Sequence, residues 1–258
     1  MKDETVIFFG NRDLGLRILR HLISVGDVPR AVFLHPKGTS QWTDQLWELA
    51  ESIDAVVLEA DELDGNEALN TVASLQPTIG VSAYFGHILK AEMLALFPRG
   101  ILNFHGSLLP WNRGRDPNVW AIYEGTPAGG TIHLMDEGVD TGPILVQREV
   151  IVTPDMNAAD LYHLTVDALV SLGEEHWPLL RKGRIKARSQ GNGTTHRRLE
   201  FERLKQLDLT KEMTVRDAIN LLRACAVDRI VAAEFSEGGT RYSVRVNTTV
   251  VPRNGAKE

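Results

Sequence analysis

The stretch TVIFFGNRDLGLRILRHLISVG (residues 5–26) contains an apolar run, a turn and an amphipathic segment in succession. The apolar run is rich in β-branched and aromatic residues and ends at Gly10, which is typical of a buried strand. The segment after the turn places apolar residues at helical spacing: Leu14, Ile18, Leu19 and Leu22. The helical pattern ends at Gly26. The stretch therefore predicts one strand–turn–helix unit.

Similar units recur along the chain. Further short apolar runs lie at residues 30–35, 55–60, 78–83, 99–105, 129–136 and 143–152. Helical patterns lie between or after them, at residues 40–53, 62–75 and 158–180. Such alternation is typical of a mostly parallel sheet with helices on both faces. We expect an α/β protein with a doubly wound, Rossmann-like sheet.

The residue pattern changes after residue 188. Small and polar residues cluster at 189–195, which predicts a loop. The segment TVRDAINLLRACA (214–226) predicts a helix with Thr214 as its N-cap and Asp217 as the reciprocal partner. Residues 229–251 predict a β-hairpin that turns at Glu237–Gly239. We expect a main catalytic domain over residues 1–188 and a small α+β subdomain, one helix plus a hairpin, over 189–258.

The composition narrows the class of protein. With 43% hydrophobic and 24% charged residues, the chain of 258 residues is typical of a globular protein with a sizeable core. The net charge of −6 disfavours a protein that binds mainly by neutralising nucleic-acid phosphates. Because neither a secretion signal nor a long apolar span is evident, we expect a cytoplasmic protein without membrane contact. A single cysteine, Cys225, excludes an internal disulfide framework and predicts a buried structural thiol.

The segment NFHGSLLP (103–110) places two polar residues in an apolar strand-like run. Because side chains alternate along a strand, Asn103 and His105 share one face, while Leu102 and Phe104 point to the other. A lone histidine in such a run is more often a hydrogen-bonded core residue. The pair of polar residues on one face, near the end of a central strand, instead favours a functional site in the crevice where open α/β sheets bind ligands.

A second polar segment, MDEGVDTGPIL (135–145), contains three carboxylates and two glycines. Alone it is consistent with a solvated acidic turn, and its spacing matches neither a calcium loop nor a zinc site, so we expect no metal. Ser107 lacks the sequence context of a hydrolase nucleophile. Direct acyl transfer to an amine needs no protein nucleophile. In that chemistry Asn103 would donate to the oxyanion of a tetrahedral intermediate, His105 would take the amine proton and Asp140 would hold the imidazole.

The first turn, FFGNRDLG (residues 8–15), has glycines only at Gly10 and Gly15, so the dinucleotide-binding fingerprint is absent. The simplest interpretation is a tight turn at the end of a strand. A helix that begins here would still offer its backbone amides to an anionic group, so Gly10 and Asn11 are candidate substrate-binding residues.

Two segments, GILNFHGSLLPWNRG and GGTIHLMDEGVDTGPIL, together resemble the folate-dependent formyltransferases, the family that includes methionyl-tRNA formyltransferase. The resemblance implies N10-formyltetrahydrofolate as the formyl donor, with Asn103, His105 and Asp140 as the catalytic triad. It also implies a pterin pocket formed largely by backbone groups of two segments. The pocket residues expected from it are Tyr84, Phe85, Ile88, Leu89, Asp136, Gly138 and Asp140.

The segments LLPWNRGRDPNVWAI and GTTHRRLEFERL are most similar to the sugar N-formyltransferases. This similarity implies a nucleotide-linked amino-deoxysugar acceptor, dTDP-linked or similar, of the kind used for lipopolysaccharide O-antigen. It places Trp111, Asn112 and Arg113 beside the sugar; packing is the alternative role for Trp111. Methionyl-tRNA, another small amine or amino acid, and a non-catalytic sensor remain alternatives. The predicted hairpin could form a homodimer surface or pack on the preceding helix.

Overall fold

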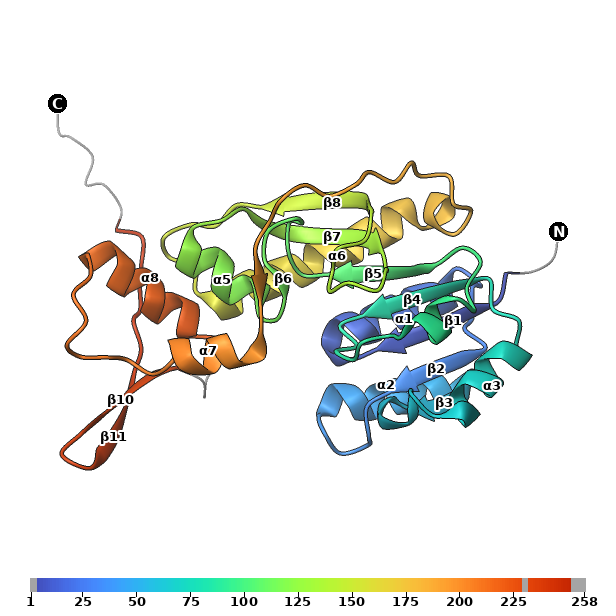
Figure 1. Cartoon of the computed structure of the whole chain (residues 1–258), viewed down its shortest axis with the longest axis horizontal. Coiled ribbons are helices and arrows are strands. Elements are labelled where there is room, and N and C mark those ends of the chain that lie inside the picture. Colours follow the sequence, from blue (N-terminus) through green and yellow to red (C-terminus); the bar gives the residue numbers. More distant parts are fainter. Residues whose placement is uncertain (1–3, 229–231, 252–258) are drawn as a thin grey trace.

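A seven-stranded sheet forms the centre of the protein in the computed structural model, which describes residues 4–228 and 232–251 (Figure 1). Its strands, in spatial order, are β3 (Val56–Glu59), β2 (Ala31–Leu34), β1 (Val6–Gly10), β4 (Ile79–Ala83), β5 (Ile101–His105), β7 (Ala128–Leu134) and β8 (Ile144–Val150). The first five strands of this order are parallel, and β7 and β8 add antiparallel pairs. The predicted mostly parallel sheet is confirmed.

Helices cover both faces of the sheet. The helices on one face are α1 (Arg12–Ser24), α2 (Gln41–Ser52) and α6 (Ala158–Leu180). The other face carries α3 (Asn66–Ser74), α4 (Ala91–Leu94) and a short 3-10 turn (Ala60–Glu62). Alternation along β1 sends Phe8 to the first face and Phe9 to the second, so the strand is buried throughout.

Strand β5 divides its side chains as the sequence predicts. Leu102 and Phe104 pack in the cluster under α6, whereas Ile101 packs in the cluster under α3 and α4. Asn103 and His105 therefore lie on the same face as Ile101, the α3/α4 face, and follow it along the strand.

The C-terminal part contains more structure than the sequence indicates. Its elements are α7 (Arg198–Leu204), α8 (Val215–Cys225), β10 (Ala233–Glu237) and β11 (Thr240–Val244). The predicted cap of α8 is confirmed, since Thr214 Oγ1 accepts from the Asp217 amide. The sequence does not predict helix α7, because its seven residues show little apolar periodicity. Of the predicted hairpin, residues 229–231 lie outside the described residues.

A third apolar cluster links this part to the main sheet. It includes α5 (Pro117–Glu124), the start of α6 and the end of α8. Cys225 is buried in it, and burial raises the pKa of its thiol to about 12, as expected for a structural cysteine.

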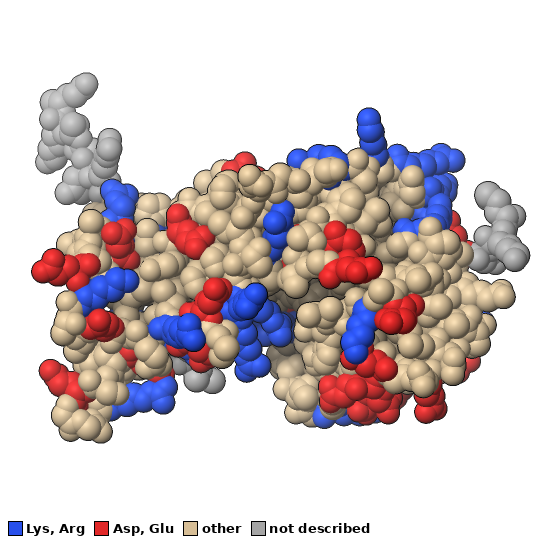
Figure 2. All heavy atoms as spheres, in the orientation of Figure 1, with Lys and Arg blue, Asp and Glu red and all other residues tan. Residues whose placement is uncertain are grey.

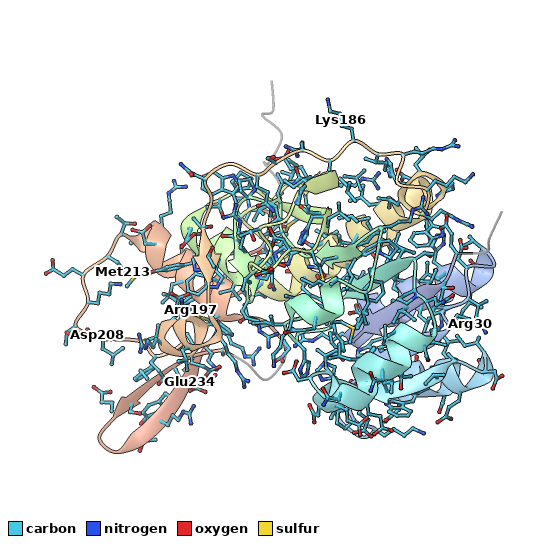
Figure 3. The ribbon with its side chains drawn as sticks, turned by 45° about the vertical axis from the view of Figure 1, so that its right-hand side comes forward. Arg30, Lys186, Arg197, Asp208, Met213 and Glu234 are labelled. Atoms are coloured by element: carbon cyan, nitrogen blue, oxygen red, sulfur yellow. The ribbon has the colours of Figure 1, made fainter. Side chains whose placement is uncertain are left out.

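The segment between α6 and α7 carries Lys186 and runs along the molecule until it reaches Arg197 (Figure 3). The sequence predicts only a loop at 189–195. The structure instead pairs β9 (Thr195–His196) with β6 (Arg113–Gly114), 82 residues away in the chain. The division at residue 188 stays a prediction. Within the described parts of the chain, no helix has the length and apolar character needed to cross a membrane.

Candidate active site

The pairing of β5 with β7 brings two polar side chains opposite each other. Asn103 is in register with His133, and His105 with Thr131. The Asn103 amide nitrogen lies 3.1 Å from His133 Nε2 and donates to Asp140 Oδ1 at 3.1 Å. Sequence reasoning missed His133, although its position two residues after Thr131 places it on the same face of β7.

The acidic turn folds back over this face. It leaves β7 after Leu134, and Asp136 Oδ1 then accepts from the Gly138 amide at 3.1 Å and from Thr141 Oγ1 at 2.7 Å. Gly142 is required by close packing, because a Cβ atom there would lie 1.8 Å from the Leu134 carbonyl oxygen. The turn thus carries Asp140 to the end of β5.

The Asp140 carboxylate is surrounded by donors. Oδ2 accepts from the Gly114 amide at 2.9 Å and lies 3.5 Å from His105 Nδ1, while Oδ1 lies 3.5 Å from His133 Nε2. Burial by itself raises the pKa of this carboxyl, but His105, His133 and the Gly114 amide outweigh burial and hold the pKa well below its usual value. Asp140 is therefore a buried anion at neutral pH.

His105 lies between two acceptors. Its Nδ1 faces Asp140, and its Nε2 lies 3.3 Å from the Asn112 carbonyl oxygen. Burial lowers the pKa of this imidazole, and His133 acts in the same direction, while Asp140 and the Asn112 carbonyl act in the opposite one. The ring is neutral at neutral pH, yet both nitrogens face groups that would stabilise an imidazolium.

The side chains of Asn112 and Arg113 in the PWNRG turn form hydrogen bonds within the protein. Asn112 is fully buried, and its side chain bonds Thr126 and Thr194. The Arg113 guanidinium donates to Gln190 Oε1 at 2.8 and 3.0 Å. In this structure the two side chains hold the turn against the C-terminal segment, and Trp111 is partly exposed.

The segment after β4 contains the other residues expected at a pterin pocket. Phe85 and Leu89 are buried in the α3/α4 cluster and fix the segment in place. Tyr84 is partly buried, and burial together with the nearby Asp13 raises the pKa of its phenol. Ile88 is 70% exposed. The segment thus presents its backbone and one aliphatic side chain outward.

The first turn is capped by Asn11. Its side-chain oxygen accepts from the Arg12 amide at 2.8 Å and starts α1, while Gly10 is buried beside it. The Asn11 side-chain oxygen is therefore occupied, and the turn also offers backbone amides.

Arginine side chains gather beside this turn. Arg12, Arg115 and Arg198 all act electrostatically on Asp116, whose pKa burial raises against their influence. Within residues 4–228 and 232–251, none of these three guanidinium groups forms a hydrogen bond or ion pair. Figure 2 shows basic side chains beside a hollow near the centre of one face of the molecule. No sequence pattern indicates this cluster, because its members lie far apart in the chain.

Comparisons with known proteins agree with this arrangement. Residues 26–171 match the formyl transferase family, and residues 200–250 match the N-formyltransferase dimerization C-terminal domain. A methionyl-tRNA formyltransferase from Desulfotalea psychrophila is 34% identical over 195 residues, which cover 73% of this chain. The chain spans 60% of the length of that relative.

Solved structures show the same fold. A sugar N-formyltransferase from a Shewanella species superposes with a TM-score of 0.83 at 22% identity, covering 96% of this chain and 99% of that one. A formyltransferase from Anoxybacillus kamchatkensis is 32% identical, with a TM-score of 0.54 over 67% of this chain and 88% of its own. That structure contains UDP-4,6-dideoxy-4-formamido-L-AltNAc and tetrahydrofolate. The family match alone covers more than half of the sequence, and the chain therefore belongs to the formyl transferase family.

Proposed function

We propose that the protein is an N-formyltransferase that moves the formyl group of N10-formyltetrahydrofolate to the amine of a nucleotide-linked amino-deoxysugar. The observation that carries the chemistry is the meeting of Asn103, His105 and Asp140 on one face of β5. Family membership supports the reaction class, and the tetrahydrofolate and formamido sugar nucleotide of the Anoxybacillus kamchatkensis relative support the two substrates.

His105 and Asp140 are suited to removing a proton from the attacking amine. With a proton on Nδ1 facing Asp140, the neutral imidazole keeps a lone pair on Nε2 that can accept the amine proton. Once Nε2 is protonated, it can donate to the Asn112 carbonyl oxygen 3.3 Å away. The two acceptors on either side of the ring then stabilise the imidazolium.

Asn103 is suited to stabilising the oxyanion. Its amide nitrogen carries two protons, one of which is donated to Asp140 Oδ1 in the resting structure. We expect the other proton to be donated to the formyl oxygen as negative charge develops there, because a charged acceptor forms the stronger hydrogen bond.

The folate would lie between the segment after β4 and the acidic turn. The backbone of Tyr84–Leu89 on one side, and Asp136, Gly138 and Asp140 on the other, could bind a flat heterocycle by hydrogen bonds. Each segment also presents an exposed aliphatic side chain, Ile88 at 70% and Val139 at 46%. These residues fit a pterin ring, whose faces are apolar and whose edges are polar.

The cluster formed by Arg12, Arg115 and Arg198, here called the arginine face, supports an anionic acceptor. Three guanidinium groups with no partner in the described residues, next to the N-terminus of the 13-residue helix α1, form a suitable environment for a diphosphate. Trp111, which is partly exposed, is a candidate for contact with the sugar. Gly10 would contribute only backbone atoms.

Methionyl-tRNA is the second candidate acceptor, because the curated relative acts on it by name. The net charge of −6 argues against it. The matched C-terminal domain further supports a homodimer as the working form.

Incubation with N10-formyltetrahydrofolate and one acceptor at a time distinguishes these candidate functions. The acceptors are a panel of 3-amino- and 4-amino-deoxysugar nucleotides, charged initiator tRNA and free amino acids, and the product is identified by mass. Formyl gain on a sugar nucleotide supports the proposal. Gain on tRNA alone would replace the acceptor, and no gain on any amine would favour a sensor.

A further inference from the structure

The segment between α6 and α7 lies against the active-site turns. Arg188 exchanges two backbone hydrogen bonds with Ile144, the first residue of β8, at 2.8 and 2.9 Å. Further along, the packing is so close that a Cβ atom on Gly193 would lie 1.8 Å from the Pro110 carbonyl oxygen. The parallel pair β6–β9 then follows. Figure 1 shows this segment running along β8 and past β6 before α7 begins.

Gln190 lies in the middle of this segment and uses its whole amide group. Its Nε2 donates to the backbone carbonyls of Asp140 at 2.8 Å and Gly142 at 2.7 Å. Its Oε1 accepts from Arg113 Nε and Nη2. Because arginine can only donate, the oxygen of the amide must face Arg113, and its NH2 group must face the two carbonyls.

These bonds act on the backbone that carries the catalytic carboxylate. Asp140 has a φ of +53°, a conformation that costs energy in a residue with a side chain and needs support from its surroundings. A neutral amide that bridges the carbonyls of residues 140 and 142 supplies such support. The Asp140 side chain then points at His105 and Asn103.

We propose that Gln190 is a positioning residue for Asp140, held in the correct orientation by Arg113. The inference rests on the proposed function, since it assumes that Asp140 acts in formyl transfer. The segment between α6 and α7 then contributes to catalysis, because Gln190 holds the backbone of Asp140, 50 residues earlier in the chain. Arg113 thereby acts on the turn through Gln190.

Two substitutions remove the bridge in different ways. Gln190→Glu keeps an acceptor for Arg113 but places a carboxylate oxygen against two carbonyl oxygens, and Gln190→Met keeps the length without any hydrogen bond or charge. We expect each to lower kcat about 10- to 100-fold, because small displacements of a catalytic group have effects of that size. The KM values for folate and acceptor should change less than about threefold.

Gln147→Glu is the matched control. The Gln147 amide also donates twice, to the Leu109 carbonyl and to Thr131 Oγ1, but it touches neither Asp140 nor Gly142. Its substitution makes the same chemical change on β8 and should lower kcat less than threefold. A normal kcat in both Gln190 variants, or an equal loss in Gln147→Glu, would overturn the assignment.

Hydrogen exchange measured by mass spectrometry gives a readout independent of turnover. Gln190→Met should speed amide exchange in the peptide that covers residues 136–143, and Gln147→Glu should not. If the wild-type chain transfers no formyl group, the proposed function fails, while unchanged exchange in Gln190→Met separately refutes the role of Gln190 in holding the turn.

Discussion

Two aspartates of this protein, Asp140 and Asp116, have nearly the same strained backbone and opposite electrostatic environments. Their φ angles are +53° and +54°. The pKa of Asp140 is lowered because hydrogen bonds and two imidazoles outweigh burial, whereas burial raises the pKa of Asp116 although three arginines act to lower it.

The difference lies in where the positive groups point. The donors around Asp140 are partly or fully buried and aim at the carboxylate, so their interaction is strong. The side chains of Arg12, Arg115 and Arg198 are exposed, and water screens their charge from Asp116. The first arrangement stabilises charge within the protein, and the second leaves positive charge available to a ligand. We therefore expect changes at the Asp140 site to affect turnover and changes at the arginine face to affect acceptor binding.

The largest effect is expected at the buried site. His105→Ala and Asn103→Ala should each lower turnover by about two to four orders of magnitude, the usual size of acid–base and oxyanion contributions. Steady-state kinetics with folate and acceptor both varied provides the measurement. Near-normal turnover in either variant would remove that residue from the mechanism.

Stability should separate the two aspartates. Asp140→Asn should lower the free energy of unfolding at pH 7 by about 2 kcal/mol, because it weakens hydrogen bonds to a buried charge. Since the folded pKa of Asp140 is lowered, its contribution is present above the unfolded value of 3.8 and is lost as the pH falls below it. Asp116→Asn should cost less than about 0.5 kcal/mol, because folding disfavours its ionised form. Urea titrations measure the free energy of unfolding of both variants. Equal losses would contradict the proposed difference between the two aspartates.

The arginine face should act on binding. Arg12→Gln, Arg115→Gln and Arg198→Gln should each raise the KM for a nucleotide-linked acceptor about tenfold, as the loss of one charge-assisted contact does. The kcat value should stay within about threefold, and raising the salt concentration should weaken acceptor binding more in wild type than in the variants. Arg17→Gln serves as a control, since Arg17 already pairs with Asp167 on the surface. Unchanged KM in all three variants would remove the diphosphate site.

The smallest effect is a pH dependence of stability. Burial holds the pKa of folded His105 below the unfolded value of 6.5, so the unfolded chain binds more protons as the pH falls through that value. The free energy of unfolding should therefore decrease between about pH 7 and pH 5, and His105→Gln should flatten the slope. His87, whose pKa burial also lowers, contributes with the same sign, and His87→Gln measures its share. A slope that His105→Gln leaves unchanged would contradict a neutral, buried His105.

Local sequence patterns predict the parts of the structure that depend on short spacing. The alternation in ILNFH places Asn103 and His105 on one face, and helical spacing identifies α1 and α6. Gln190 could not be predicted, because its contacts with Asp140 and Arg113 span 50 and 77 residues and leave no periodic signal. Arg113 illustrates the same limit. Its side chain donates to Gln190, a contact that the local sequence around Arg113 does not indicate.

The proposed reaction is tested most directly with N10-formyltetrahydrofolate that carries an isotope-labelled formyl carbon. The labelled donor is incubated with an amino-deoxysugar nucleotide and either the wild-type protein or Asp140→Asn. The account predicts that the label appears as a formamide on the sugar nitrogen with wild-type protein and at a rate lower by at least about a hundredfold with the variant. Absence of label on every amine tested, or an equal rate in the variant, would contradict it.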